Sequence, residues 1–204
     1  MAKPKDQHFL EAALENFESF SDLYIDNEAF SAIPIFGTAF KICKGMDDIR
    51  SRIFAAKISA FISEPSLQAP DIKEKLKRKA ELPEEANKIG ETLFFVLEKI
   101  TDNEKPGLLA KIFVAYLDGV ISNNELRRLA QAVDLAFIDD MKDLLLDASV
   151  DPYRLRGEWP ESLLVSGLTT TYVISMSGSA QQDYKLTKLG LSFKRAISHS
   201  NNYG

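Results

Sequence analysis

The chain of 204 residues is 45% hydrophobic and 27% charged, a balance that excludes an intrinsically disordered protein. Its net charge of −5 excludes a global basic field that would attract nucleic acid. Cys43 is the only cysteine, which excludes an intramolecular disulfide, and the lack of an apolar leader or of an apolar run near ~20 residues predicts a cytoplasmic protein.

The N-terminal third of the chain predicts helices. Apolar residues at helical spacing favour a first helix over residues 7–25. A later helix starts with Asp47 as its cap and carries an apolar stripe up to Ile62. Pro65 and Pro70 then bracket the loop that ends this helix.

The segment at residues 33–46 is apolar on most sides. Pro34 suits the first turn of a short helix there, and Gly45 suits the position just after its end. Such a segment can insert into a membrane interface, where neighbouring basic residues meet lipid phosphates. The basic residues are Lys41, Lys44, Arg50 and Arg52. Because apolar helices of soluble proteins mostly lie in the core, we interpret the segment as a core helix and keep peripheral membrane association as an alternative.

The middle of the chain predicts two more helices before a tight turn. Residues 71–81 carry a basic run, which we interpret as a solvated helix face because acidic residues balance it. Pro83 suits the first position of the next helix. A further apolar stripe runs from Leu109 to Leu117 and stops at Gly119.

The clearest local signal follows that glycine. Ser122 and Glu125 have the spacing of a capping box, and Ile121 and Leu126 stand where a hydrophobic staple needs apolar residues. The helical pattern that starts there continues, with a bend near Asp134, to about Leu146. This stretch therefore predicts two helices that meet at a tight turn.

The C-terminal quarter predicts a β-hairpin and one last helix. Thr169–Met176 is rich in β-branched residues, which favours a strand. After a turn at 177–179, residues 182–186 predict the returning strand. Thr187 then caps a closing helix that runs through Ile197.

These elements predict a mainly α fold, a multi-helix bundle with a small C-terminal hairpin module. Turn-rich residues from Asp147 to Pro160 divide the chain into a helical bundle at 1–146 and a module at 147–204 packed on it. From Asp151 onward, six basic and four acidic residues give a charge of +2, which leaves −7 for residues 1–150. This contrast favours two modules.

The C-terminal pattern resembles the end of a winged-helix domain. Residues 164–168 end in a Gly-Leu pair, a hairpin follows, and residues 184–190 read Tyr-x-Leu-Thr-x-x-Gly. The resemblance implies DNA binding through a recognition helix near Trp159–Val165. Candidate phosphate contacts are Arg154, Arg156, Lys185, Lys188, Lys194 and Arg195. Glu158 and Glu161 stand where DNA reading needs basic or amide side chains, so DNA binding is an alternative.

Over most of its length the chain resembles a group of small, uncharacterised helical proteins of bacteria and phages. The shared features are an Ile-Pro-rich segment at 33–35 and a helix of Asp-Ile-Arg-x-Arg-x-Phe type at 48–54. A closing helix of Leu-Thr-x-Leu-Gly-x-x-Phe type at 186–193 completes the likeness. The resemblance implies a helical fold and carries no activity.

The sequence shows no catalytic constellation. His8 and His199 lie near opposite ends, where chains often fray, and a zinc site needs more His and Cys ligands than this chain offers. A calcium loop counted back from Gly119 places Val114 and Tyr116 where oxygen ligands are required. We therefore expect no catalytic residue, no metal and no cofactor, and we expect the protein not to be an enzyme.

Two functional hypotheses follow from the sequence. The first is a cytoplasmic interaction or regulatory protein of bacterial or phage type, which binds an unidentified protein partner through an exposed helical or hairpin surface. The second is a transcriptional regulator that uses the winged-helix-like module as a homodimer, so that two modules reach successive major grooves.

Overall fold

The computed structural model describes residues 49–147, 155, 157–176 and 179–203. Within these ranges the chain is mainly helical and ends in a two-stranded antiparallel sheet followed by a last helix, which confirms the predicted fold class. The expected helix at 7–25, the apolar segment at 33–46 and the cap at Asp47 lie outside the described residues. The elements are α4 (Ile49–Ile62), η1 (Pro65–Gln68), α5 (Pro70–Ala80), α6 (Pro83–Lys99), α7 (Lys105–Leu117), α8 (Asn123–Leu135), α9 (Ile138–Leu146), α10 (Trp159–Ser162), β1 (Thr169–Met176), β2 (Ser179–Leu186), α11 (Lys188–Ser200) and η2 (Asn201–Tyr203).

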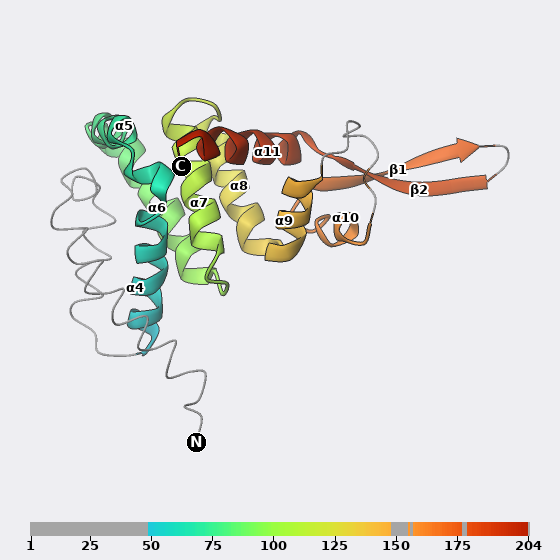
Figure 1. The fold of residues 1–204 in the computed structure, drawn as a ribbon, viewed down its shortest axis with the longest axis horizontal. Coiled ribbons are helices and arrows are strands. Elements are labelled where there is room, and N and C mark those ends of the chain that lie inside the picture. Colours follow the sequence, from blue (N-terminus) through green and yellow to red (C-terminus); the bar gives the residue numbers. More distant parts are fainter. Residues whose placement is uncertain (1–48, 148–154, 156, 177–178, 204) are drawn as a thin grey trace, which may run out of the picture.

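Helix α7 is the centre of the core. Its sequence is apolar on nearly every side, so it needs cover from several directions. Helices α4, α5, α8 and α11 all pack against it. Figure 1 shows α11 running across α7 and α8, although α11 follows α7 by some seventy residues in the sequence. The last helix is therefore part of the main core.

The turn between α7 and α8 has the predicted form. Gly119 adopts a left-handed conformation with a φ of 73°. Its N–H donates to Tyr116 O and the next N–H, from Val120, donates to Ala115 O, which is the paired hydrogen bonding of a Schellman motif. Ser122 and Glu125 then form the capping box at the start of α8.

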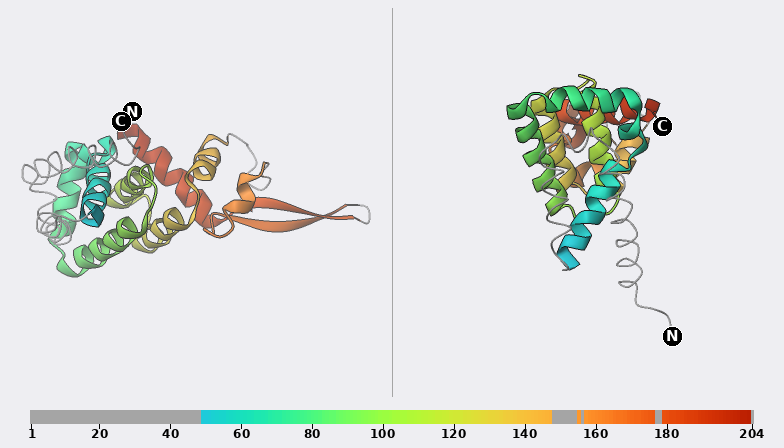
Figure 2. Two further views of the ribbon diagram at one scale, coloured as in Figure 1. Left: turned by 90° about the horizontal axis from the view of Figure 1, so that it is seen from below. Right: turned by 90° about the vertical axis from the view of Figure 1, so that its left-hand side faces the viewer.

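The hairpin extends away from the helices, as Figure 1 and the left view of Figure 2 show. Its register is uninterrupted, from Thr169 opposite Leu186 to Met176 opposite Ser179. The returning strand begins at Ser179, not at 182 as predicted, because the ladder continues to the pair of Met176 and Ser179. The predicted recognition helix at 159–165 is also wrong in length: α10 ends at Ser162, and the chain turns through residues 163–167.

Helix α11 is fixed to the base of the hairpin by its first turn. The Thr187 hydroxyl accepts a hydrogen bond from the Gly190 N–H (3.0 Å) and donates to Gly167 O (2.7 Å), so one side chain caps the helix and holds the segment before β1. The helix continues to Ser200, three residues past its predicted end at Ile197. A Cβ on Gly190 would overlap the carbonyl oxygen of Leu168. Only glycine allows this approach.

Replacing Gly190 with alanine is expected to lower the free energy of unfolding by about 1–3 kcal/mol, because the added methyl group pushes α11 away from backbone atoms that have no room to move. Gly107→Ala is the matched control. Gly107 is likewise the third residue of its helix, and its Cβ would meet only the tip of the Glu64 side chain at 3.3 Å. Urea unfolding should show Gly107→Ala unchanged or more stable by up to about 1 kcal/mol. Equal losses in both variants would contradict the close-approach explanation.

Candidate functional site

Of the six residues proposed to contact DNA, the four that the structure describes do not form one open basic face. Arg154 and Arg156 lie outside the described residues. The Lys194 ammonium donates to Asp147 O at 2.6 Å, and Lys185 lies over the Tyr172 ring at 5.6 Å. Arg195 is paired with Glu125 at 3.2 Å. Lys188 is exposed on the first turn of α11. Three of the four described residues therefore already make contacts within the chain.

A buried carboxylate, Asp118, gathers three side chains from distant parts of the chain. Asp118 ends α7, and its side chain is only 5% exposed. Its Oδ1 accepts from Lys75 Nζ at 2.5 Å, and its Oδ2 contacts His199 Nε2 at 2.6 Å and accepts from the Tyr203 hydroxyl at 2.5 Å. Helix α5, helix α11 and η2 are joined at this one group.

The hydrogen-bond partners of Asp118 stabilise its negative charge. We call Asp118 and these partners the Asp118 cluster. A carboxylate at the C-terminal end of a helix faces the negative end of the helix dipole, and burial penalises its charge further. Burial acts to raise the pKa of Asp118, but hydrogen bonds from Lys75, Tyr203 and His199 outweigh it, and the pKa is lowered. The hydrogen bond to Asp118 raises the pKa of Lys75 in turn. The cluster therefore holds its charges in the folded protein.

The Asp118–His199 pair has the composition of a general-base dyad. In this structure the contact joins α11 to the end of α7. In the described part of the chain, the hydrogen-bond partner found for the His199 side chain is Asp118. Nucleophilic dyad chemistry needs a nucleophile on the other ring nitrogen, and no hydrogen bond to such a group is found among the described residues. Sequence reasoning placed His199 at a fraying end, which is wrong, because Asp118 holds it from 81 positions earlier.

A second carboxylate, Glu125, joins the start of α8 to α11. Its Oε2 accepts from the Ser122 N–H at 2.9 Å, while its Oε1 accepts from the Ser192 hydroxyl at 2.6 Å and from Arg195 at 3.2 Å. The hydrogen bond from the Ser122 backbone and then that from Ser192 lower the pKa of Glu125 to about 2. The sequence identified Glu125 as a capping residue but gave no sign of its contacts with α11.

Exposed apolar side chains also gather where the turn at 163–167 meets α8. Leu135, Leu164 and Val165 are 48%, 36% and 67% exposed and surround one hollow of about 250 Å³. We call this surface the apolar hollow. It is lined by Arg128, Gln131, Ala132, Leu135, Leu164, Val165, Ser166, Gly167 and Leu189. The three exposed apolar side chains thus lie around one concavity that also has polar groups in its lining.

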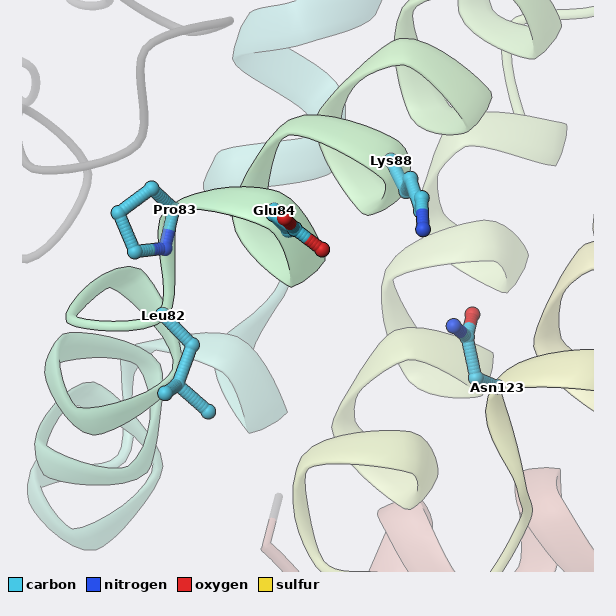
Figure 3. Close-up of a pocket in the computed structure, with 5 residues that line it drawn as sticks. All are labelled: Leu82, Pro83, Glu84, Lys88 and Asn123. Atoms are coloured by element: carbon cyan, nitrogen blue, oxygen red, sulfur yellow. The ribbon is translucent and has the colours of Figure 1, made fainter.

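A second hollow lies between the start of α6 and α8, and its lining is more apolar than that of the first. Figure 3 shows Lys88 of α6 and Asn123 of α8 on one side of it and Leu82 on the other, with Pro83 and Glu84 at the start of α6. Leu82 is 55% exposed. The opposite charges of Glu84 and Lys88 leave this hollow without a net charge preference. It offers no arrangement of acid, base and nucleophile.

Comparison of the chain with protein-family models, with curated proteins and with solved structures gives no match. Among the described residues, no three or more His, Cys, Asp or Glu side chains are grouped so that they could hold a metal ion. No helix in the described ranges combines the length and apolar character that crossing a bilayer requires. The resemblances to a winged-helix end and to small phage and bacterial proteins stay predictions.

The lowered pKa of Glu125 predicts how stability depends on pH. A carboxylate with a depressed folded-state pKa contributes stability that is fully present above its ordinary value of 4.5 and is lost as pH falls through about 2. Replacing Glu125 with Gln should cost about 1 kcal/mol at neutral pH, and the difference from the wild type should shrink as pH falls from 4.5 towards 2. Urea unfolding of both proteins over this pH range measures the difference in their free energies of unfolding.

The control for this experiment is Glu91→Gln, at an exposed position of α6. This variant should follow the wild-type pH profile throughout. Asp118 remains in all three proteins, so the acid sensitivity that it contributes cancels in the comparison. Parallel curves for the wild type and Glu125→Gln down to pH 2 would show that the network does not hold the Glu125 charge.

Proposed function

We propose that this chain is a protein-interaction or regulatory protein that binds its partner at the apolar hollow. The observation that carries the proposal is the grouping of Leu135, Leu164 and Val165, three exposed large apolar side chains from two separate segments, around one concavity. The segments come from α8 and the turn after α10, and Leu189 of α11 also lines the hollow. A cytoplasmic location belongs to the same proposal.

The rim of the hollow indicates the chemistry of the partner. Arg128 is exposed there, and the described residues offer it no ion pair or hydrogen bond. A free guanidinium beside an apolar concavity suits a carboxylate, which it can bind through two parallel hydrogen bonds. The partner we propose is therefore a protein segment whose apolar side chains enter the hollow and whose Asp or Glu meets Arg128.

The DNA-binding alternative has less support. Lys194 and Arg195 already bind groups of this chain, and α10 is a single turn with Glu161 in it. A recognition helix has to reach base edges over several residues. Association with a membrane through residues 33–46 rests on the sequence pattern alone.

Replacing Val165 with Asp is expected to weaken partner binding about tenfold or more, because a charge enters the centre of an apolar contact. Arg128→Glu should weaken the same complex and reduce its salt dependence. The measurement has two parts. Short random peptides selected on the immobilised full-length chain should be enriched in apolar residues next to Asp or Glu. Proteins captured from a bacterial lysate should then be compared between variants.

Leu146→Asp is the matched control, since Leu146 is 79% exposed and does not line the hollow. It should retain the peptides and proteins that Val165→Asp loses. If both Asp variants retain them equally, the hollow is not the binding surface. If the selected peptides are basic, the proposed partner chemistry is wrong.

A further inference from the structure

The hairpin formed by β1 and β2 has an exposed strand edge. The two strands form a sheet with no third strand among the described residues, and they extend beyond the helical body (Figures 1 and 2). A two-stranded sheet alone in water is marginally stable and usually gains stability from packing or from further strands. This edge is a different surface from the apolar hollow.

The bridge at Leu155 shows which backbone groups face outward. The Leu155 N–H donates to Tyr184 O at 2.9 Å, and the Tyr184 N–H donates to the Asp183 side chain, so the backbone of Tyr184 faces away from β1. In an antiparallel ladder, the N–H and C=O of one residue face the same side, and the side alternates along the strand. Tyr184 lies opposite Thr171, so the backbone of Thr171 also faces away from its partner strand.

Alternation extends this assignment along β1. The N–H and C=O groups of Thr171, Val173 and Ser175 face outward, and those of Tyr172 and Ile174 face β2. No backbone partner for the three outward residues is found in the described ranges.

This edge lacks the features that protect free edges in other proteins. Exposed strand edges are usually blunted by charged residues, by proline or by a bulge. The chain from Thr169 to Gln182 contains no Asp, Glu, Lys, Arg or Pro, and the register has no bulge. Val173 is 68% exposed at the centre of the edge. On the opposite edge, Leu155 covers the base of β2.

We propose that the β1 edge pairs with the β1 edge of a second copy of this chain, antiparallel and about a two-fold axis at Val173. In this register Val173 meets its own counterpart, and Thr171 meets Ser175 of the second copy, so the outward N–H and C=O groups match without any shift. An isologous contact of this kind needs no partner sequence other than its own. Two chains that each carry −5 repel, and an uncharged strand lets them meet without adding repulsion at the contact.

The test compares two proline variants of the full-length chain at the same level of the hairpin. Val173→Pro removes an outward N–H from the β1 edge, and Gln182→Pro removes the outward N–H of the residue directly opposite, on the β2 edge. Neither touches a hydrogen bond between the strands. Sedimentation should show a wild-type dimer with a dissociation constant of roughly micromolar size, because the interface is small. Val173→Pro should be monomeric, and Gln182→Pro should remain dimeric.

Two further measurements are independent of any effect of proline on folding. Val173→Lys keeps every hydrogen bond of the hairpin and places two ammonium groups side by side at the two-fold axis of the dimer. It should therefore weaken the dimer at least tenfold, and added salt should restore part of the affinity because it screens the repulsion. In the wild type, raising the protein concentration should slow amide hydrogen exchange at Thr171 and Val173 and leave Tyr172 and Ile174 unchanged. A monomeric wild type, or a dimer that both proline variants leave intact, would overturn the proposal.

Discussion

The structure depends on the need to cover α7 from all sides. Ten of its thirteen residues are buried, which is more than one neighbouring helix can cover. Helices α4, α8 and α11 pack around α7 and bury its apolar side chains. Helix α11 in turn fixes the base of the hairpin through Thr187 and Gly190. The two carboxylate clusters hold α11 at two places: Glu125 contacts the middle of the helix and Asp118 contacts its C-terminal turn. The positions of the apolar hollow and of the strand edge follow from this arrangement.

The sequence predicted the features that depend on near neighbours in the chain. The end of α4 at Ile62, the tight turn at Gly119 and the capping box at Ser122 all arise from patterns within a few residues, and each is confirmed. The clusters were not predicted. Asp118 and His199 are 81 positions apart, and only the crossing of α11 over α7 brings them together. The apolar hollow depends on the same crossing.

The winged-helix-like motif has a physical reason within this fold. In Leu-Thr-x-Leu-Gly, the threonine caps α11 and holds the carbonyl group of Gly167, and the glycine lets the helix approach the backbone of Leu168. In this fold both residues join the start of α11 to the base of the hairpin. The motif therefore has a packing role here that does not depend on any ligand.

The long stretch of chain between α7 and α11, which covers one side of it, has a consequence during translation. The hydrogen bond from Ser200 to Lys111 O closes a separation of 89 residues. At about 5–20 residues per second, a ribosome needs roughly 5–20 s to make that stretch. During this time α7 has an apolar side with nothing to cover it, and the nascent chain is open to aggregation or to chaperones. Chains that stop before α11 should be cleared by proteases.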